Sequence, residues 1–254
     1  MSRLLLRLLL MSVLFSSTAY SSLVETVGLI KPSVVGIGVY TPTGQPKNQL
    51  YGSGFVIGDG TYVVTNSHVI AKELDEGLLQ ELAVFTGKGV AAKVRIATLI
   101  ATDKEHDIAI LKIKGQPLPA LQLAQSKFKP EGSSIAFTGF PIGAVLGLYP
   151  VTHRGIIAAV TPTIIPVDDS RQISIAMIKR LRDPYLVYQL DATAYPGNSG
   201  SAMYDLETGK VIGIINKVFV QESKETVISK PSGITYAIPV KYLHQLLKQH
   251  NIKS

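Results

Sequence analysis

The chain has 254 residues and no cysteine, and its 25 basic and 18 acidic residues give a formal net charge of +7. The absence of cysteine excludes a disulfide framework and a cysteine nucleophile. The length is enough for one large domain or two small ones with a sizeable core. Basic residues form no dense stripe interleaved with aromatic residues, so the composition argues against nucleic acid as a partner.

Residues 1–21 have the three parts of a secretory signal peptide, namely a short basic start with Arg3 and Arg7, an apolar run at 8–15, and small residues at 16–21. The apolar run is shorter than the roughly 20 residues that a transmembrane helix needs. The sequence therefore predicts export, with the mature protein periplasmic or extracellular and without a stable membrane span after signal removal. An uncleaved N-terminal anchor is the alternative.

The next part of the chain consists of short apolar runs separated by glycine, proline and asparagine, which is typical of an all-β protein. A helical turn is expected at 24–30 and a short helix at 69–74. Asp59 and Gly60 form a strong two-residue hairpin signal between two of the runs. The expected strands lie at residues 34–40, 52–58, 61–65, 82–85, 89–96, 99–101 and 108–113.

Residues 115–132 are rich in turn-forming residues and are expected to link two halves of the molecule. In the second half, Leu243, Leu246 and Leu247 share one face of an expected helix at 240–250. Residues 161–184 predict an elongated hairpin or surface loop, or a lid or partner-docking segment beside the site. The expected strands of this half lie at residues 133–138, 151–160, 186–190, 211–220 and 235–238.

A Gly-Asn-Ser-Gly turn at 197–200 contains the candidate nucleophile, Ser199. A serine hydroxyl is almost never ionised at neutral pH, so it needs a base within hydrogen-bonding reach. His68, just after an expected strand, supplies an imidazole, which is the usual base. Asp107, which heads a later strand, would hold that imidazole in the right tautomer. The chain order His, Asp, Ser is that of chymotrypsin-type double barrels.

Six ordered motifs extend this pattern from about residue 24 to 247. They are GSGFVI at 52–57, VVTNSHV at 63–69, HDIAILK at 106–112, GNSGS at 197–201, KVIGIIN at 210–216 and GITYAIP at 233–239. In these motifs the chain resembles a trypsin-like peptidase of the high-temperature-requirement (Deg) type. The resemblance implies a chymotrypsin/trypsin-like double six-stranded β-barrel with a C-terminal helix, divided into barrels at 22–122 and 123–254. Few residues follow that helix, so the PDZ domain common in the family is not expected.

The resemblance also implies roles for residues around the serine. The N–H groups of Gly197 and Ser199 would form an oxyanion hole, with Asn198 shaping the turn. Thr193, six residues before the serine, would lie at the base of the S1 pocket. A threonine there cannot neutralise a cation, which predicts small or medium apolar P1 residues. The edge strand that pairs with an extended peptide substrate would contain three further residues, Asn216, Lys217 and Val218.

Two features depart from the family pattern or raise a question about it. Ser201 stands where the family usually has a second glycine, and it would be strained if that position needed a positive φ. Tyr195 and Pro196 precede the expected oxyanion hole, and proline fixes φ and donates no hydrogen bond. In Deg relatives this loop can rest in an inactive shape, so a resting inactive state is an open hypothesis.

The function expected from these residues is a serine endopeptidase that cleaves unfolded or extended polypeptides without a metal or an organic cofactor. A latent or non-proteolytic peptide-binding or sensor module on the same fold is one alternative, and an esterase-like hydrolase is another. The family resemblance allows a homo-oligomer. His106 is expected to be a bystander because adjacent strand residues face opposite ways. Three other histidines are expected to be surface or core residues, His153, His244 and His250.

Overall fold

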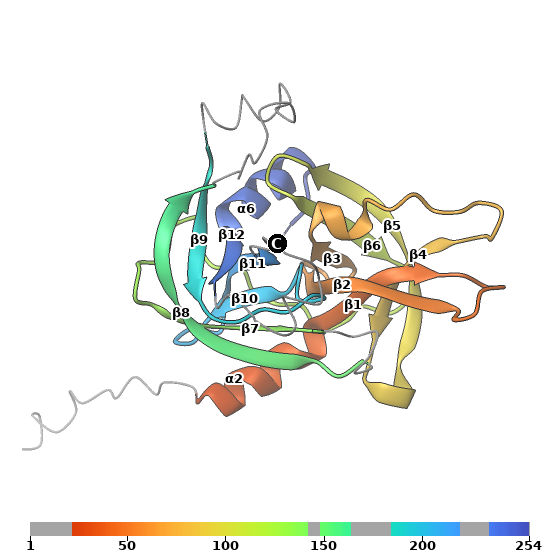
Figure 1. Cartoon of the computed structure of the whole chain (residues 1–254), viewed down its shortest axis with the longest axis horizontal. Coiled ribbons are helices and arrows are strands. Elements are labelled where there is room, and N and C mark those ends of the chain that lie inside the picture. The colour runs from red at the N-terminus through yellow and green to blue at the C-terminus, as the bar shows by residue number, and fades with distance from the viewer. Residues whose placement is uncertain (1–21, 142–147, 164–183, 219–233, 254) are drawn as a thin grey trace, which may run out of the picture.

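The computed structural model describes residues 22–141, 148–163, 184–218 and 234–253. Within them, the chain forms two closed barrels of six strands each, followed by a C-terminal helix. Figure 1 shows the two barrels side by side. The predicted all-β double barrel is therefore confirmed. The predicted signal peptide lies outside the described residues, and none of the helices that are described is long and apolar enough to cross a lipid bilayer.

The first barrel has the strand order β1-β2-β3-β6-β5-β4. The predicted hairpin joins β2 to β3, with Gly60 at φ +85° and the Asp59 carboxylate accepting a hydrogen bond from the Thr61 N–H at 2.9 Å. Helix α2 (Leu23–Ile30) precedes the barrel, as expected. Its other elements are β1 (Val34–Tyr40), β2 (Asn48–Ile57), β3 (Tyr62–Thr65), β4 (Glu81–Thr86), β5 (Lys93–Asp103), β6 (Ile108–Ile113) and the 3-10 helices η1 (Lys31–Ser33), η2 (Ser67–Ile70) and η3 (Gly89–Ala91).

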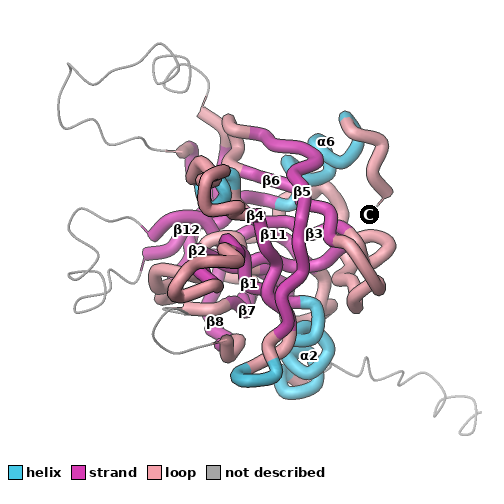
Figure 2. Tube along the Cα trace, turned by 90° about the vertical axis from the view of Figure 1, so that its right-hand side faces the viewer, coloured by secondary structure: helices cyan, strands magenta, loops and turns pink. Residues whose placement is uncertain are grey.

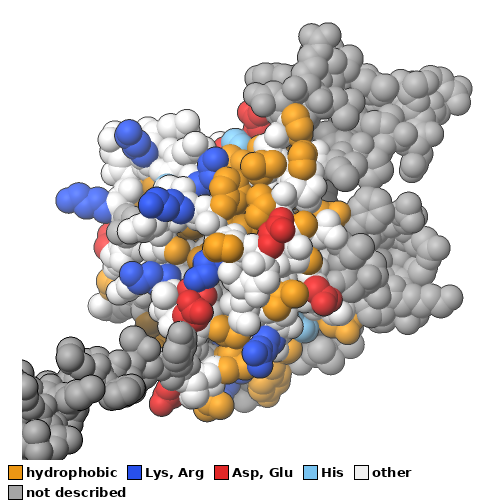
Figure 3. Space-filling view, turned by 90° about the vertical axis from the view of Figure 1, so that its left-hand side faces the viewer, with side chains coloured by type: hydrophobic (Ala, Val, Ile, Leu, Met, Phe, Trp, Pro, Cys, Tyr) orange, Lys and Arg blue, Asp and Glu red, His pale blue; other side chains and the backbone are white. Residues whose placement is uncertain are grey.

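The second barrel has the strand order β10-β11-β12-β9-β8-β7. Its strands are β7 (Ser134–Gly139), β8 (Val151–Pro162), β9 (Leu186–Asp191), β10 (Ala202–Asp205), β11 (Val211–Val218) and β12 (Ile234–Pro239), and helix α6 (Val240–Gln249) follows. Most of the segment for which a hairpin, loop or lid was expected, 164–183, lies outside the described residues. Figure 3 shows that lysine and arginine side chains on the β8–β9 side are interspersed with acidic and uncharged ones.

Three elements differ from the prediction. In place of the two strands expected at 89–96 and 99–101, residues 93–103 form one strand, β5, while residues 89–91 form the 3-10 helix η3. Strand β5 continues through a register shift between Leu99 and Ala101. Strand β10 was not expected, because it has only four residues and is defined by its pairing with β7 and β11. The short helix expected at 69–74 is the 3-10 helix η2, which begins at Ser67 and ends at Ile70.

One hydrophobic cluster extends across both barrels. It contains Phe55 and Ile110 from the first barrel and Tyr204 and Ile214 from the second, all without exposed surface. Helix α6 contacts β11 and β12 of the second barrel and β5 of the first, and Figure 2 shows it beside β5 and β6, at the end opposite α2. The apolar face predicted for this helix is buried in the same cluster through Leu243, Leu246 and Leu247.

Candidate active site

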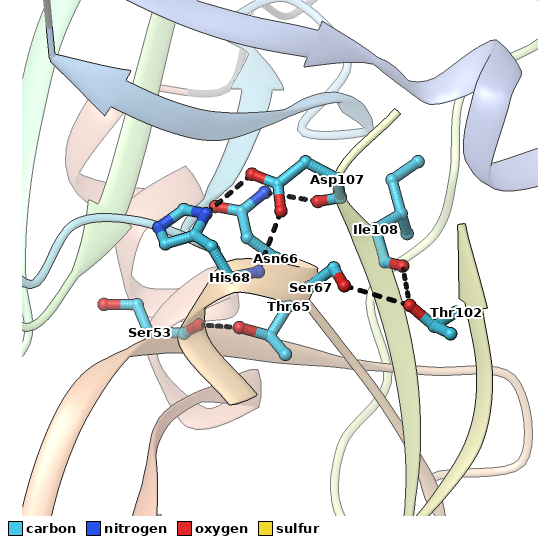
Figure 4. A network of polar contacts seen from close by, with 8 residues as sticks. All are labelled: Ser53, Thr65, Asn66, Ser67, His68, Thr102, Asp107 and Ile108. Atoms are coloured by element: carbon cyan, nitrogen blue, oxygen red, sulfur yellow. Dashed lines mark hydrogen bonds and ion pairs between the residues drawn. The ribbon is translucent and has the colours of Figure 1, made fainter. Parts of the chain in front are cut away.

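His68 and Asp107 contact each other at the end of the first barrel (Figure 4). His68 lies in η2, directly after β3, and Asp107 lies in the turn before β6. The His68 Nδ1 atom is 2.6 Å from Asp107 Oδ2, and the His68 backbone N–H donates to Asp107 Oδ1 at 2.8 Å. The carboxylate therefore contacts both the ring and the backbone of the histidine, which fixes the orientation of the imidazole.

Asp107 has an unusual backbone conformation, with φ at +55°. A non-glycine residue in this left-handed region is strained, and it persists only where its surroundings hold it. Here the Asp107 carbonyl accepts hydrogen bonds from the Asn66 side-chain amide at 3.0 Å and from the Ser67 N–H at 3.2 Å. Asn66 is fully buried, so these bonds tie the aspartate turn to the segment that carries His68.

The serine loop begins with a tight turn from Tyr195 to Asn198. The Asn198 N–H donates to the Tyr195 carbonyl at 3.0 Å, and Gly197 has φ +97°. Proline in the second position and a positive-φ glycine in the third are the features of a type II turn, so Pro196 suits this geometry. The φ angle of Ser201 is not positive, so the strain considered for this residue is not present.

Ser53 of β2 attaches this loop to the first barrel. Its backbone N–H donates to the Ser199 carbonyl at 2.8 Å, and its hydroxyl donates to the Gly197 carbonyl at 2.6 Å while accepting from the Phe140 N–H at 2.8 Å. A Cβ on the neighbouring Gly52 would lie 3.0 Å from the Ser199 carbonyl oxygen and 2.8 Å from Val69, the residue after His68. Gly52 is therefore close to both the loop that carries Ser199 and the segment that carries His68.

The residues expected at the substrate pocket lie on the adjoining part of the second barrel. Thr193 is half-buried in the segment after β9. The buried Thr235 of β12 braces this segment, because its hydroxyl donates to the Ala192 carbonyl at 2.7 Å and accepts from the Ala194 N–H at 3.1 Å. The expected peptide-pairing residues, 216–218, form the end of β11, where Asn216 is half-buried.

Two of the remaining histidines have partners other than His68. His106 contacts Asp103 with Nδ1 at 2.6 Å from the carboxylate, and its ring stacks on Tyr242 of α6 at 4.0 Å. His244 Nε2 lies 2.8 Å from the Ala124 carbonyl oxygen, to which its N–H donates. Across the part of the chain that is described, no three His, Asp or Glu side chains are grouped closely enough to hold a metal ion.

Sequence reasoning assigned no role to Ser53, Asn66 or His153, although all three contact the serine loop or the aspartate turn. Ser53 and Asn66 lie inside the motifs at 52–57 and 63–69, so these motifs were an available signal. His153 carries no such signal, because its contact with Asn198 depends on how β8 is placed in the second barrel.

Comparisons with known proteins agree with this geometry. The family described as trypsin-like peptidase domain matches residues 52–214. A "probable periplasmic serine endoprotease DegP-like" of Halomonas elongata is 32% identical over 190 residues, which are 74% of this chain and 32% of that protein. A protein of the same description from Pseudomonas fluorescens is 31% identical over 197 residues, or 77% of this chain and 34% of that protein. The chain thus spans about a third of the length of the curated relatives it matches.

Solved structures with the same fold include a serine endoprotease from Yersinia pestis, with a TM-score of 0.62 and 25% identity over 91% of this chain and 66% of that one. The HtrA-type protease AlgW, solved with a tripeptide, has a TM-score of 0.65 and 27% identity over 90% of this chain and 63% of that one. The family match covers more than half of the chain and coincides with the observed double barrel. On these grounds, the chain belongs to the trypsin-like peptidase domain family.

Proposed function

We propose that this chain is a serine endopeptidase that cleaves unfolded or extended polypeptides through an acyl-enzyme intermediate. The observation that carries the proposal is the His68–Asp107 contact of 2.6 Å beside a loop that holds Ser199. An imidazole oriented by a carboxylate is the base that a serine hydroxyl needs. The position of Gly52 close to both the Ser199 carbonyl and Val69, the residue after His68, supports their acting together.

The proposed mechanism starts with attack of the Ser199 hydroxyl oxygen on the scissile carbonyl while His68 takes its proton. His68 then returns this proton to the leaving amine, which breaks the peptide bond and leaves an acyl-enzyme. A water molecule, deprotonated by the same imidazole, releases the second product. Asp107 keeps the Nδ1–H of the ring turned toward itself and stabilises the imidazolium that forms in each step.

The oxyanion hole in this proposal consists of the Gly197 and Ser199 N–H groups, with Asn198 closing the turn. Within the described chain, neither of these N–H groups donates a hydrogen bond. Two unpaired donors on the nucleophile's own turn are what stabilisation of a developing oxyanion requires. This arrangement supports an active resting loop over the inactive shape.

For the substrate pocket, we propose that Thr193 lies at the base of S1 and favours small or medium apolar P1 residues. The neutral threonine supports this, because it offers no charge for a lysine or arginine side chain. The end of β11 would pair with the substrate through residues 216–218, by adding the peptide as an extended strand.

We further propose that the chain acts outside the cytoplasm, in the periplasm or beyond it, after removal of residues 1–21. The names of the Halomonas elongata and Pseudomonas fluorescens relatives, which call those proteins periplasmic, support this location. Export also agrees with the leader-like composition of the N-terminus. A homo-oligomer is compatible with this proposal. The proposed cleavage of polypeptide substrates uses no cofactor.

Casein digestion by the mature protein and by the Ser199→Ala variant tests the proposal, with the cut sites read by mass spectrometry. We expect cleavage after small or medium apolar residues by the mature protein and none by the variant. Cuts after lysine or arginine would overturn the pocket assignment. If the mature protein does not cleave casein and does not react with a fluorophosphonate, the alternative of a peptide-binding module replaces the proposal. Reaction with small esters alone would indicate the esterase-like alternative.

A further inference from the structure

His153 of β8 is half-buried and lies directly beside the serine turn. Its ring stacks on Phe137, the residue that faces it across β7 and β8, with ring centroids 4.9 Å apart and an interplanar angle of 20°. The ring of Tyr195, the first residue of the turn, is also close, with its centroid 5.9 Å from that of His153. The His153 Nε2 atom is 3.4 Å from the side-chain amide nitrogen of Asn198. The ring is thus held by two aromatic neighbours with Nε2 directed at the turn.

The contact with Asn198 requires an uncharged ring. An amide NH₂ can only donate, so the Nε2 atom that it faces must be the unprotonated, accepting nitrogen. Burial lowers the pKa of His153 below its ordinary value, because water is removed from the charged form. Tyr195 is the one titratable side chain among the described groups that contact the ring, and Arg154 points to the opposite face of β8. The surroundings therefore favour the neutral, accepting ring.

The Asn198 side chain has no hydrogen bond to any described residue other than His153. Its side chain is fully buried, and its Oδ1 atom has no hydrogen-bond partner in the described chain. The same is true of the Ser201 hydroxyl, and both oxygens lie within 3.1 Å of the point where a Cβ on Gly139 would sit. The side chain of Asn198 is thus held by His153 alone among the described residues, while its backbone N–H closes the turn.

We propose that His153 is a positioning residue for the oxyanion turn, which it holds by accepting a hydrogen bond from the Asn198 side chain. Ser53 holds the same turn from the first barrel through the Gly197 carbonyl, so the turn is fixed from two sides. A misplacement of a donor by even 1 Å is costly for a developing oxyanion. This inference rests on the proposed peptidase function, and it assigns to His153 an effect on the transition state rather than on substrate binding.

Two variants of His153 separate the hydrogen bond from the packing. His153→Phe keeps an aromatic ring on Phe137 but removes the nitrogen, and we expect kcat to fall about tenfold with KM unchanged within about twofold. His153→Gln places a neutral polar group near the same position, and we expect it to restore at least half of kcat. His244→Gln is the matched control, because His244 is bonded to the Ala124 carbonyl and has no contact with the turn. A change in KM alone, or equal kcat in all four proteins, would overturn the inference.

NMR of the Ser199→Ala protein provides a second test that needs no activity. We expect the Asn198 side-chain amide resonances to shift with pH at the same midpoint as the His153 ring, below the ordinary histidine value of 6.5. In the His153→Gln background this shift should vanish. An Asn198 amide that does not respond when His153 titrates would refute the hydrogen bond. If the amide responds but the mature protein neither cleaves peptides nor reacts with a fluorophosphonate, the positioning contact stands and the peptidase proposal fails.

Discussion

Ser53 and Ser201 are both fully buried beside the serine turn, but their hydroxyl groups differ in hydrogen bonding. The Ser53 hydroxyl bridges the Gly197 carbonyl and the Phe140 N–H, at 2.6 and 2.8 Å. The Ser201 hydroxyl has no partner in the described chain. Because a buried polar group is costly only when it is unsatisfied, the same serine-to-alanine change should have opposite consequences at these two positions.

For Ser53→Ala we expect a loss of about 1–3 kcal/mol in the free energy of unfolding, because the Phe140 N–H is left without a partner. We also expect kcat to fall about tenfold, because the Gly197 carbonyl is released and the turn loses one of its two supports. Urea unfolding and peptide hydrolysis measure the two effects. Ser126→Ala is the control for the loss of a hydroxyl, since Ser126 is exposed and has no hydrogen bond within the described chain. A Ser53→Ala protein with unchanged kcat would contradict the role of the bridge.

For Ser201→Ala we expect the opposite sign, with the free energy of unfolding unchanged or increased by up to about 1 kcal/mol. The change removes an unpaired buried oxygen and leaves a methyl group that fits the same space. Urea unfolding of the variant beside Ser53→Ala gives the comparison. A loss above 1 kcal/mol would mean that the Ser201 hydroxyl is satisfied, for example by a buried water molecule.

His68 and Asp107 could both be named from the sequence, because each stands in a short motif that can be recognised without knowing the fold. His153 could not, because its ring meets Asn198 only through the register that pairs it with Phe137. The strain considered at Ser201 also depended on a backbone angle that residue types do not determine. The role of His153 and the conformation of Ser201 thus depend on the folded backbone, and residue types alone do not predict them.

The turn between β5 and β6 is the element that presents Asp107, and it contains a second histidine–aspartate pair. Asp103 accepts from the His106 and Glu105 N–H groups at 3.0 Å each and lies 2.6 Å from the His106 ring nitrogen. His106 in turn stacks on Tyr242, which connects this turn to α6. Burial raises the pKa of Asp103, but the hydrogen bonds from His106 and Glu105 outweigh it, and the net pKa is lowered.

A lowered pKa in the folded state means that the ionised Asp103 stabilises the protein above its unfolded pKa, near 3.8, and that this stabilisation disappears as the pH falls through the folded value. We therefore expect Asp103→Asn to cost about 2 kcal/mol at pH 7 and progressively less below pH 3.8. Urea unfolding across this range measures it. Asp59→Asn, at an exposed hairpin, should cost less than about 0.5 kcal/mol. An equal cost of Asp103→Asn at both ends of the range would contradict the linkage.

Strand existence was predictable where apolar runs were long, as in β1 and β6, but not where pairing alone defines the strand. Strand β10 has only four residues, and its role is to carry the chain from the serine loop into the sheet between β7 and β11. The register shift between Leu99 and Ala101 made β5 resemble two strands in the sequence. Irregular pairing in the barrels, rather than residue composition, explains these differences.

At the scale of the whole molecule, the segment between the barrels is hydrogen-bonded to each of them in turn. The Leu121 N–H donates to the Val56 carbonyl in the first barrel at 2.8 Å. The next contacts are with the second barrel, where the Val211 N–H donates to the Gln122 carbonyl at 2.9 Å. This supports a boundary at 122/123, which we propose as the division between the halves. The active-site proposal draws His68 and Asp107 from one side of it and Ser199 from the other.

We expect the two proposed halves to fold as one unit. Phe55 and Ile110 of the first barrel belong to the same buried cluster as Tyr204 and Ile214 of the second. Each fully buried side chain of this size contributes about 1.5–3 kcal/mol, and a whole domain is stable by only about 5–15 kcal/mol. Loss of the shared cluster would therefore remove most of the free energy of unfolding of a barrel, so neither barrel should be stable alone.

Residues 22–122 expressed alone should accordingly give a poorly dispersed NMR spectrum, and residues 22–254 with Ser199→Ala should unfold in a single transition by circular dichroism. Leu246 lies on the apolar face of α6 and is 2% exposed. Leu246→Ala should lower the free energy of unfolding of the whole protein by about 2–5 kcal/mol, because it leaves a cavity in the shared cluster. Leu29→Ala, at a side chain that is 75% exposed, should leave the transition nearly unchanged. Two separate transitions, or a folded first half, would show that the barrels are independent and that the active site forms only by docking.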